Sequence, residues 1–403
     1  MPDTLSHLRS RVAAELTDGI LPYWMAHTLD DEHGGFVGRI THEGRVVVGA
    51  PKAAVLNTRI LWTFAAAARV LRDDRYRAVT ERAYGVLADH FWDDEHGGIY
   101  WMVDHTGRPL DTKKQIYAQA FAVYALAEYY RLTGDASVLE RAIGLYRTVE
   151  RHSFDPAHGG YFEAYSRAWT LLDDVRLSDK DANEKKSMNT HLHLLEAYTN
   201  LYRIWPDPSL KNQSWGLIEL FQTTIVDAET GHLHLFFDEV WTPRSTVISF
   251  GHDIETSWLL VEAAEVLGEP DVLASVQKTA VRMAQVTLDE GRDDDGALLN
   301  EIGPDGHVDD GCYWWPQAEA VVGFLNAYQL TSAPRFLDAA LACWTFIENH
   351  LIDWERGEWF ARVARDGTPY ASQDKVGPWK GPYHNARVCL EVMARVEGVV
   401  FSA

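Results

Sequence analysis

Short stretches in which an acidic residue and a glycine precede alternating aromatic and β-branched residues recur along the chain. The six stretches are DDEHGGFVGR, DDEHGGIYWMV, DPAHGGYFEA, AETGHLHLFF, DDDGALLNEI and WERGEWFARV. Glycine supplies the positive φ of a tight turn, and the alternating residues after it are typical of short strands. The pattern therefore predicts six β-hairpins. Their glycines are Gly35, Gly98, Gly160, Gly231, Gly296 and Gly357, about 60 to 70 residues apart, which is a supersecondary period.

Between successive hairpins lie two segments with helical periodicity, such as residues 53–71 and 75–91. Six such pairs predict twelve helices. Closing the pairs into a ring buries the apolar faces that an open array leaves at its ends. We therefore expect an all-α fold, an (α/α)6 barrel with short β-hairpins between helix pairs, forming one catalytic domain over residues 1–403. An open helical solenoid is the alternative, and it is less favoured because the terminal repeats show no polar capping pattern.

The first helix of each pair opens with polar residues and then turns strongly apolar, as in LLEAYTNLY and AVVGFLNAY. Aligning the six starts groups Arg59, Gln119, His193, Glu255, Glu319 and Arg387. A lone polar residue here would be read as a helix cap or a buried hydrogen-bond partner. Six in register indicate a shared pocket at one mouth of the barrel, where parallel helix amino termini favour negative charge.

Composition narrows the substrate and the compartment. The chain is 46% hydrophobic and 24% charged, as in ordinary globular proteins, and its net charge of −22 disfavours nucleic acid or an anionic membrane as a partner. Its 15 Trp, 17 Tyr and 15 Phe can supply rings that stack on a neutral sugar. Cys312, Cys343 and Cys389 suit reduced thiols, and no export signal or run of about 18 apolar residues is present. We expect a cytoplasmic monomer.

Two histidines occupy equivalent positions on inner helices, one turn before Glu255 and Arg387. They are His252 and His384, from the fourth and sixth repeats, which one neighbouring repeat separates in a ring. Inverting a carbon requires proton removal on one face and proton return on the other. Imidazole, with a reference pKa near 6.5, can exchange protons in both directions at neutral pH. The pair predicts a sugar 2-epimerase that works through an enediolate.

Neighbouring residues would serve the same reaction. Arg59 and His193 are candidate donors to the enediolate oxygen. Glu255 is three residues from His252, so it is expected to lie near that imidazole and raise its basicity, and Glu319 has a similar place. Trp315 and Trp379 are expected to stack on sugar. Trp314, beside Trp315, is as readily a packing residue.

A metal site and a cofactor site are both disfavoured. His191 and His193, two residues apart on a helix, point to nearly opposite sides and cannot jointly chelate. A site drawn from His193, Glu255 and His384 is the remaining metal alternative. No glycine-rich phosphate loop and no nucleophile elbow are present. We expect neither metal nor cofactor.

At these residues the chain resembles the cellobiose 2-epimerases of the N-acylglucosamine 2-epimerase superfamily. The motifs are LNTRILWTF, KQIYAQAFAVYAL, SMNTHLHLLEAY, SFGHDIETSWLL, YWWPQAEAVVGFLNAY and KVGPWKGPYHNARVCLE, spread over nearly the whole chain. The resemblance implies an (α/α)6 barrel that epimerises β-1,4-linked disaccharides such as cellobiose, lactose and mannobiose, without a cofactor.

Carried over residue by residue, the resemblance implies roles for individual side chains. His252 and His384 would be the acid/base pair, with Glu255 supporting His252. The reacting sugar would be held by Arg59, Tyr117, Asn189 and His193. Trp315 and Trp379 would stack on the disaccharide, and loop residues Asp181 and Glu301 would contact its non-reducing unit.

Four other functions stay open at this point. Aldose-ketose isomerases and N-acylglucosamine 2-epimerases of the same superfamily have much the same histidines. A glycoside hydrolase could use two carboxylates such as Glu255 and Glu319. For a glycan-binding module without catalysis, the aromatic residues would suffice.

Overall fold

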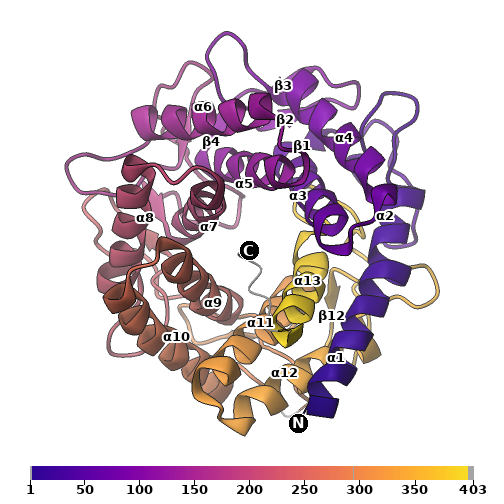
Figure 1. Ribbon diagram of the computed structural model, residues 1–403, viewed down its shortest axis with the longest axis vertical. Helices are drawn as coiled ribbons and strands as arrows, with labels where there is room; N and C mark the ends of the chain where they lie inside the picture. The colour runs from indigo at the N-terminus through magenta and orange to yellow at the C-terminus, as the bar shows by residue number, and fades with distance from the viewer. Residues whose placement is uncertain (1, 294, 398–403) are drawn as a thin grey trace.

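A computed structural model describes residues 2–293 and 295–397 of the chain. Residues 1, 294 and 398–403 of the predicted domain lie outside it, among them Asp294 of the fifth hairpin. Six helices form the inner ring: α3 (Ala54–Leu71), α5 (Ile116–Thr133), α7 (Met188–Ile204), α9 (Phe250–Leu267), α11 (Trp314–Thr331) and α13 (Tyr383–Glu397). Figure 1 looks down this ring.

The outer ring consists of the helices that alternate with these along the chain. It comprises α1 (Pro2–Ala14) with η1 (Glu15–Ile20) and α2 (Leu21–His27), η2 (Asp74–Tyr76) with α4 (Arg77–Val86) and η3 (Leu87–Phe91), α6 (Ala136–His152), α8 (Pro208–Leu220) with η4 (Phe221–Ile225), α10 (Pro270–Glu290), and α12 (Pro334–Phe346) with η5 (Ile347–Leu351). Each inner helix contacts the next, and α13 contacts both α3 and α1, which closes the ring (Figure 1). Over the described residues the predicted barrel of twelve helical segments is confirmed, and an open solenoid is excluded.

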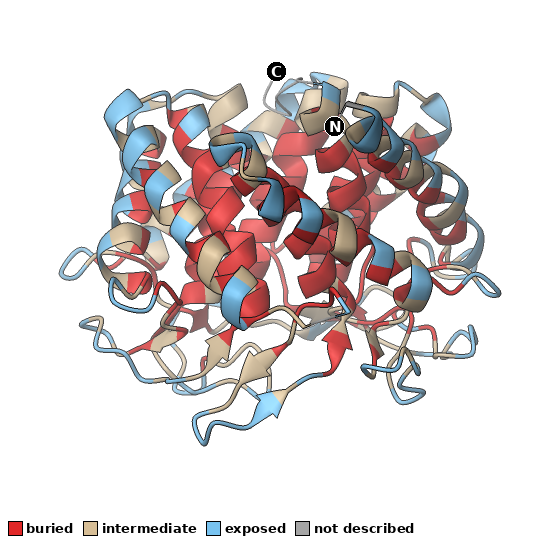
Figure 2. Ribbon diagram, turned by 90° about the horizontal axis from the view of Figure 1, so that it is seen from below, coloured by how far each residue is buried: buried red, intermediate tan, exposed pale blue. Residues whose placement is uncertain are grey.

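Burial explains which helix stands inside. Every residue from Ala54 to Ala68 of α3 is buried, so this helix is apolar on all sides and fits only between other elements. Outer helices such as α6 bury one stripe, including Val138, Ala142 and Leu145, and leave the rest to solvent. Figure 2 shows the inner helices as the buried layer of the molecule. Within the described part of the chain, no helix combines the length and the apolar composition needed to cross a membrane.

Short antiparallel strands connect neighbouring repeats below the barrel (Figure 2). Strand β1 (Lys52–Ala53) pairs with β2 (Met102–Val103), which also pairs with β3 (Pro109–Asp111), β4 (Lys114–Gln115) with β5 (Ala164–Tyr165), β6 (Lys186–Ser187) with β7 (Phe236–Phe237), and β11 (Cys312–Tyr313) with β12 (Arg362–Val363). Strand β9 (Glu301–Ile302) pairs with β8 (Ile248–Ser249) and β10 (Val308–Asp309). A bridge between Ile40 and Val376 joins the last repeat to the first. The strand that leads into an inner helix is thus tied to the next hairpin.

The six glycines expected in the turns all have positive φ, between 70° and 92°. Gly160 shows why glycine is needed there for a second reason. A Cβ at this position would lie 2.3 Å from the indole of Trp241 and 2.7 Å from Nε2 of His191. The hairpin prediction is confirmed, and this turn is packed directly beneath neighbouring side chains.

A polar residue at the fourth position of several inner helices holds the hairpin in front of it. Gln119 accepts a hydrogen bond from the backbone N–H of Ile99 at 2.8 Å and donates to its carbonyl at 2.9 Å. Gln317 binds Leu298 in the same way. The grouping of Gln119 with Arg59 is therefore wrong. Arg59 is the sixth residue of α3, and the sixth residue of α5 is Phe121.

Candidate active site

A cavity of about 570 Å³ opens at the end of the barrel where the inner helices begin. Ten of the twelve side chains predicted for the site line it: Arg59, Tyr117, Asp181, Asn189, His193, His252, Glu255, Trp315, Trp379 and His384. Their elements begin at positions spread over the whole chain. The repeat register is what brings them together, since each comes from the first turns of an inner helix or from a loop beside them.

Two loops contribute lining residues that the sequence did not single out. They supply Leu177, Ser178, Asp179 and Lys180 on one side, and Ser372, Gln373, Asp374, Gly377, Pro378 and Lys380 on the other. Predicted Asp181 lies in the first loop, where its carboxylate accepts from the backbone N–H of Ser178 at 2.8 Å. These loops lack helical or strand periodicity, so only the proximity of Trp379 to His384 could have pointed to the second.

Glu301 and Glu319 are the two predicted residues outside the lining. Glu301 lies on β9, where it pairs in register with Ser249 of β8. Burial raises the pKa of its carboxyl, and the nearby charge of Asp309 adds to this. Its predicted contact with the far sugar unit stays a prediction. Glu319 lies behind the cavity and acts on a residue that lines it.

Arg59 brings a buried positive charge to the cavity. Its side chain is 4% exposed, and Nη2 donates to the hydroxyl of Tyr117 at 3.0 Å, while Nη1 donates to the backbone carbonyl of Trp379 at 2.9 Å. Among the described residues it has no carboxylate partner. The guanidinium lies over the ring of Phe121, with Cζ 4.6 Å from the centroid. Because a buried cation without an anion is costly, this one is suited to a ligand oxygen that carries negative charge.

His193 and Asn189 come from the first two turns of α7. Nδ1 of His193 is 2.9 Å from a carboxylate oxygen of Glu196, so it acts as the donor and leaves Nε2 for the cavity. Asn189 has a buried side-chain oxygen with no hydrogen-bond partner in the described structure. An unsatisfied acceptor in a cavity lining is available to a ligand hydroxyl. The neighbouring His191 instead accepts from the N–H of Tyr161 at 2.8 Å, so the two histidines have separate roles, as expected.

His384 is oriented by a carboxylate. Its Nδ1 is 2.6 Å from Glu319, which also accepts from Arg387 at 2.7 Å and from the indole of Trp258 at 3.0 Å. Because this carboxylate accepts from three donors, Nδ1 of His384 carries the proton and Nε2 carries the lone pair. Burial, followed by the charges of Arg59 and Arg387, lowers the pKa of His384 well below its ordinary value. The resting imidazole is neutral.

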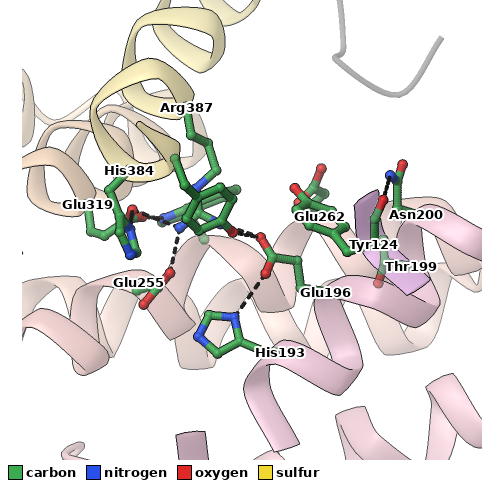
Figure 3. A network of polar contacts seen from close by, with 12 residues as sticks. Tyr124, His193, Glu196, Thr199, Asn200, Glu255, Glu262, Glu319, His384 and Arg387 are labelled. Atoms are coloured by element: carbon green, nitrogen blue, oxygen red, sulfur yellow. Dashed lines mark hydrogen bonds and ion pairs between the residues drawn. The ribbon is translucent and has the colours of Figure 1, made fainter. Parts of the chain in front are cut away.

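Arg387 is the centre of a buried charge network that reaches two of the site histidines. Its guanidinium contacts Glu196, which holds His193, and Glu319, which holds His384, as well as Glu255. Figure 3 shows Arg387 on α13 surrounded by these three carboxylates. The alignment of repeats placed Arg387 at the pocket. Its role is to bind the carboxylates that orient the histidines, and it is not among the lining residues.

His252 has a different partner from the one expected. Nδ1 of its imidazole is 2.8 Å from the hydroxyl of Ser249, and Glu255 binds Arg387 at 2.5 Å. The structure thus places Glu255 on Arg387 rather than on His252. The reason is the arginine from α13, which offers a charged donor that a neutral imidazole cannot match. Burial, followed by the charge of His193, lowers the pKa of His252 to about 3.

Glu255 holds a carboxyl whose protonation changes near neutrality. Burial raises its pKa to about 7, helped by the charge of Glu319 and opposed by that of Arg387. One arginine faces three carboxylates here, so the carboxylate with the fewest donors takes up a proton first. Because Glu255 also lines the cavity, it can exchange this proton with a bound ligand.

Two tryptophans form an aromatic wall. The indole of Trp315 lies against both acid/base candidates, with ring centroids 4.7 Å from His252 and 5.7 Å from His384. Trp379 contacts Tyr117 at 5.7 Å and Trp101 at 5.9 Å. Trp314 also lines the cavity, although it is 7% exposed, and its indole N–H has no hydrogen-bond partner in the part of the chain that the structure describes. A wall of this kind offers flat apolar faces beside hydrogen-bonding groups, which suits a sugar ring.

One cluster has the composition of a metal site. Ligand atoms of Glu255, Glu319 and His384 lie within 4.8 Å of one another. The guanidinium of Arg387 already binds both carboxylates, and His384 donates to one of them. An ion would have to displace this cation, so the donor set fits a metal poorly. The predicted combination with His193 is not this cluster, because His193 faces Glu196.

Comparison with known proteins places this geometry in a family. Residues 34–387 match the model of the N-acylglucosamine 2-epimerase (GlcNAc 2-epimerase) family. A cellobiose 2-epimerase of Bacteroides fragilis is 48% identical over 387 residues, covering 96% of this chain and 98% of its own. One of Ruminococcus albus is 38% identical with the same coverage. The solved cellobiose 2-epimerase from Bacillus thermoamylovorans B4167 has a TM-score of 0.93 and 39% identity, covering 97% of this chain and 100% of its own.

Proposed function

The chain belongs to the N-acylglucosamine 2-epimerase family and is a carbohydrate 2-epimerase, and we propose that it inverts C2 of the reducing-end sugar of cellobiose and related β-1,4-linked disaccharides. The observation that carries the mechanism is the pair of neutral imidazoles, from α9 and α13, in one cavity with a buried guanidinium that has no carboxylate partner among the described residues.

The proton transfers can be written so that every group returns to its starting state. Ring opening moves the C1 hydroxyl proton to one imidazole, while Glu255, with a pKa of about 7, gives a proton to the ring oxygen. The other imidazole then removes the C2 proton. The first imidazole returns its proton to the opposite face of C2. On ring closure the second imidazole protonates the C1 oxygen, and Glu255 recovers its proton.

Between the two transfers the substrate is an enediolate whose charge must be stabilised. Arg59 and Tyr117 line the cavity and can donate to its oxygens, and the amino termini of the inner helices lie at the same end. The predicted donor His193 instead offers the lone pair of Nε2, which can accept from a sugar hydroxyl. We assign Asn189 to a sugar hydroxyl, because its side-chain oxygen is buried and unsatisfied. Trp315 and Trp379 would stack on the sugar rings, and Asp181 would meet the second unit. A cavity of about 570 Å³ has room for a disaccharide.

Two other reactions fit the site less well. A hydrolase needs two carboxylates on either side of the glycosidic bond. Here Glu255 and Glu319 both bind Arg387, and Glu319 lies behind the cavity, where it is hydrogen-bonded to His384. Isomerisation to a ketose starts from the same enediolate and differs only in returning the proton to C1. Only the reaction products therefore distinguish isomerisation from epimerisation.

The test is cellobiose turnover in heavy water, followed by nuclear magnetic resonance and chromatography. We expect a 2-epimer with deuterium at C2. His252→Ala and His384→Ala should each lower kcat at least about 100-fold, whereas His307→Ala, an exposed histidine, should not. Release of glucose would indicate a hydrolase, a ketose as the main product would indicate an isomerase, and unlabelled epimer would refute the deprotonation mechanism.

We also propose that the protein works as a cytoplasmic monomer. The ten predicted side chains that line the cavity all come from one chain, which supports a site formed by a single copy. Cys312, Cys343 and Cys389 are buried free thiols, which suits a reducing compartment. Sedimentation of the purified protein would test the first statement, and fractionation of the source cells the second.

A further inference from the structure

Ser249 makes an unusual use of its position. It is the residue before α9, where a serine hydroxyl ordinarily accepts a hydrogen bond from a free N–H of the helix. In α9 no such bond forms. The hydroxyl of Ser249 is instead 2.8 Å from Nδ1 of His252, and the residue is 1% exposed.

The equivalent serine of another repeat shows the ordinary arrangement. Ser187 precedes α7 in the same way, and its hydroxyl accepts from the backbone N–H of Thr190 at 3.1 Å. The two serines therefore stand at the same position of the repeat with different partners. The difference is the histidine at the third position of α9, where α7 has Thr190.

The three histidines that line the cavity are held in two different ways. His193 and His384 face carboxylates, which only accept hydrogen bonds while ionised. His252 faces a neutral hydroxyl, and its ring forms no other hydrogen bond with the described residues. Its remaining large contact is the indole of Trp315. One bond to Ser249 thus fixes which nitrogen of His252 is directed to the substrate.

We propose that Ser249 is the positioning residue of His252: its hydroxyl accepts from Nδ1–H and holds Nε2 toward C2 of the substrate. This inference rests on the proposed function. In both protonation states of the reaction Nδ1 carries a proton, so the same bond serves when Nε2 removes a proton and when it returns one. Because the partner is neutral, it adds no charge to a cavity that must stabilise an anion.

Ser249→Ala should affect the two epimers differently. Epimerisation should slow about tenfold in both directions, since both directions share the same proton transfers and one hydrogen bond to the ring is lost. The exchange of the C2 hydrogen with solvent should differ between the two epimers. Once its ring has opened, the epimer deprotonated by His384 should still form the enediolate, which then regains a hydrogen, now deuterium, on its starting face. The epimer deprotonated by His252 should neither exchange nor epimerise efficiently.

The experiment measures deuterium at C2 of remaining substrate and of product in heavy water, starting from cellobiose and, separately, from its 2-epimer. We expect the ratio of exchange to epimerisation to rise for one starting epimer only, and Ser249→Thr, which keeps the hydroxyl, to restore it. Ser187→Ala is the matched control, since it removes a helix cap. It should leave the ratio of exchange to epimerisation at the wild-type value for each starting epimer.

Two results would overturn the inference. If Ser249→Ala matches the wild type, the hydroxyl has no role in proton transfer. If exchange and epimerisation fall in proportion for both epimers, Ser249 is only structural. Failure of the proposed function would look different, because the wild type itself would then neither epimerise nor exchange.

Discussion

Replacing Arg387 by methionine tests whether one cation stabilises the three carboxylates around it. Arg387 is 1% exposed and binds Glu196, Glu255 and Glu319. Methionine has a similar length and no charge, so it removes the donors while filling much of the space. The carboxylates then remain buried without their shared partner, which is the situation that destabilises proteins most strongly among ion-pair changes.

The expected loss of folding free energy can be worked out from the pKa of Glu196. Burial alone would raise its pKa, but Arg387 and then His193 lower it to about 2. A fall from the reference value of 4.5 corresponds to about 3 kcal/mol of folding free energy at neutral pH. The general cost of breaking a buried ion pair, about 3–5 kcal/mol, agrees with this figure. We therefore expect Arg387→Met to lose about 3 kcal/mol at pH 7.

The loss of stability in Arg387→Met should depend on pH in a defined direction. In the wild type the depressed pKa of Glu196 contributes stability above the unfolded value, and the contribution is lost as pH falls through the folded pKa. In the variant, burial leaves the carboxylates with raised pKa values, so they are tolerated only when protonated. The difference in the free energy of unfolding between wild type and variant should therefore narrow as pH falls from 7 to 5.

Urea unfolding followed by tryptophan fluorescence measures this gap at each pH. The double variant Glu196→Gln with Arg387→Met is the control, because it removes one of the stranded charges and should recover part of the loss. A variant within about 1 kcal/mol of the wild type at pH 7, or a gap that widens as pH falls, would refute the reasoning.

Three further expectations concern the hairpins and the metal question. His232→Gln should destabilise the protein more at pH 6 than at pH 9, as measured by thermal unfolding. Burial opposes the charged imidazole, but Asp253 at 2.7 Å raises the pKa of His232 overall. The ion pair therefore stabilises the fold at low pH, and this contribution is lost as pH rises through the folded pKa. Gly160→Ala should cost about 2 kcal/mol in urea unfolding, through a positive φ and a Cβ 2.3 Å from Trp241, whereas Gly144→Ala, in an open helical position, should be neutral or stabilising. Dialysis against EDTA should leave the epimerisation rate unchanged, because a guanidinium already occupies the acidic cluster; loss of activity restored by a divalent ion would contradict this.

The fold and the two acid/base candidates could be predicted because they depend on local, repeated signals. Each turn glycine is required by its own backbone, and a helix that is apolar on all sides must stand inside. The regular succession of repeats then places His252 and His384 on inner helices that one neighbour separates. None of these steps requires knowing which side chains touch.

The partners of those histidines could not be predicted, because they come from distant parts of the chain. Glu255 is close to His252 in sequence, but Arg387 approaches it from α13, 132 residues later. Ser249 is also a neighbour of His252, and there a serine would be read as a helix cap. In the sequence Gln119 aligns with Arg59, because the position that holds the hairpin and the position that lines the cavity are often both polar and are only two residues apart. Which of them faces the cavity is decided by the hairpin that packs on the helix.

Contact between α1 and α13 has a consequence for how the protein is made. The first outer helix leaves the ribosome before the helix it packs against, and almost the whole chain is synthesised in between. Until α13 emerges, the faces of α1, α3 and α11 that it covers are exposed to water. His384 and Arg387 arrive with that same helix. A nascent or prematurely terminated chain is therefore both inactive and open along one seam, so stalled synthesis should yield aggregates or substrates for chaperones and proteases.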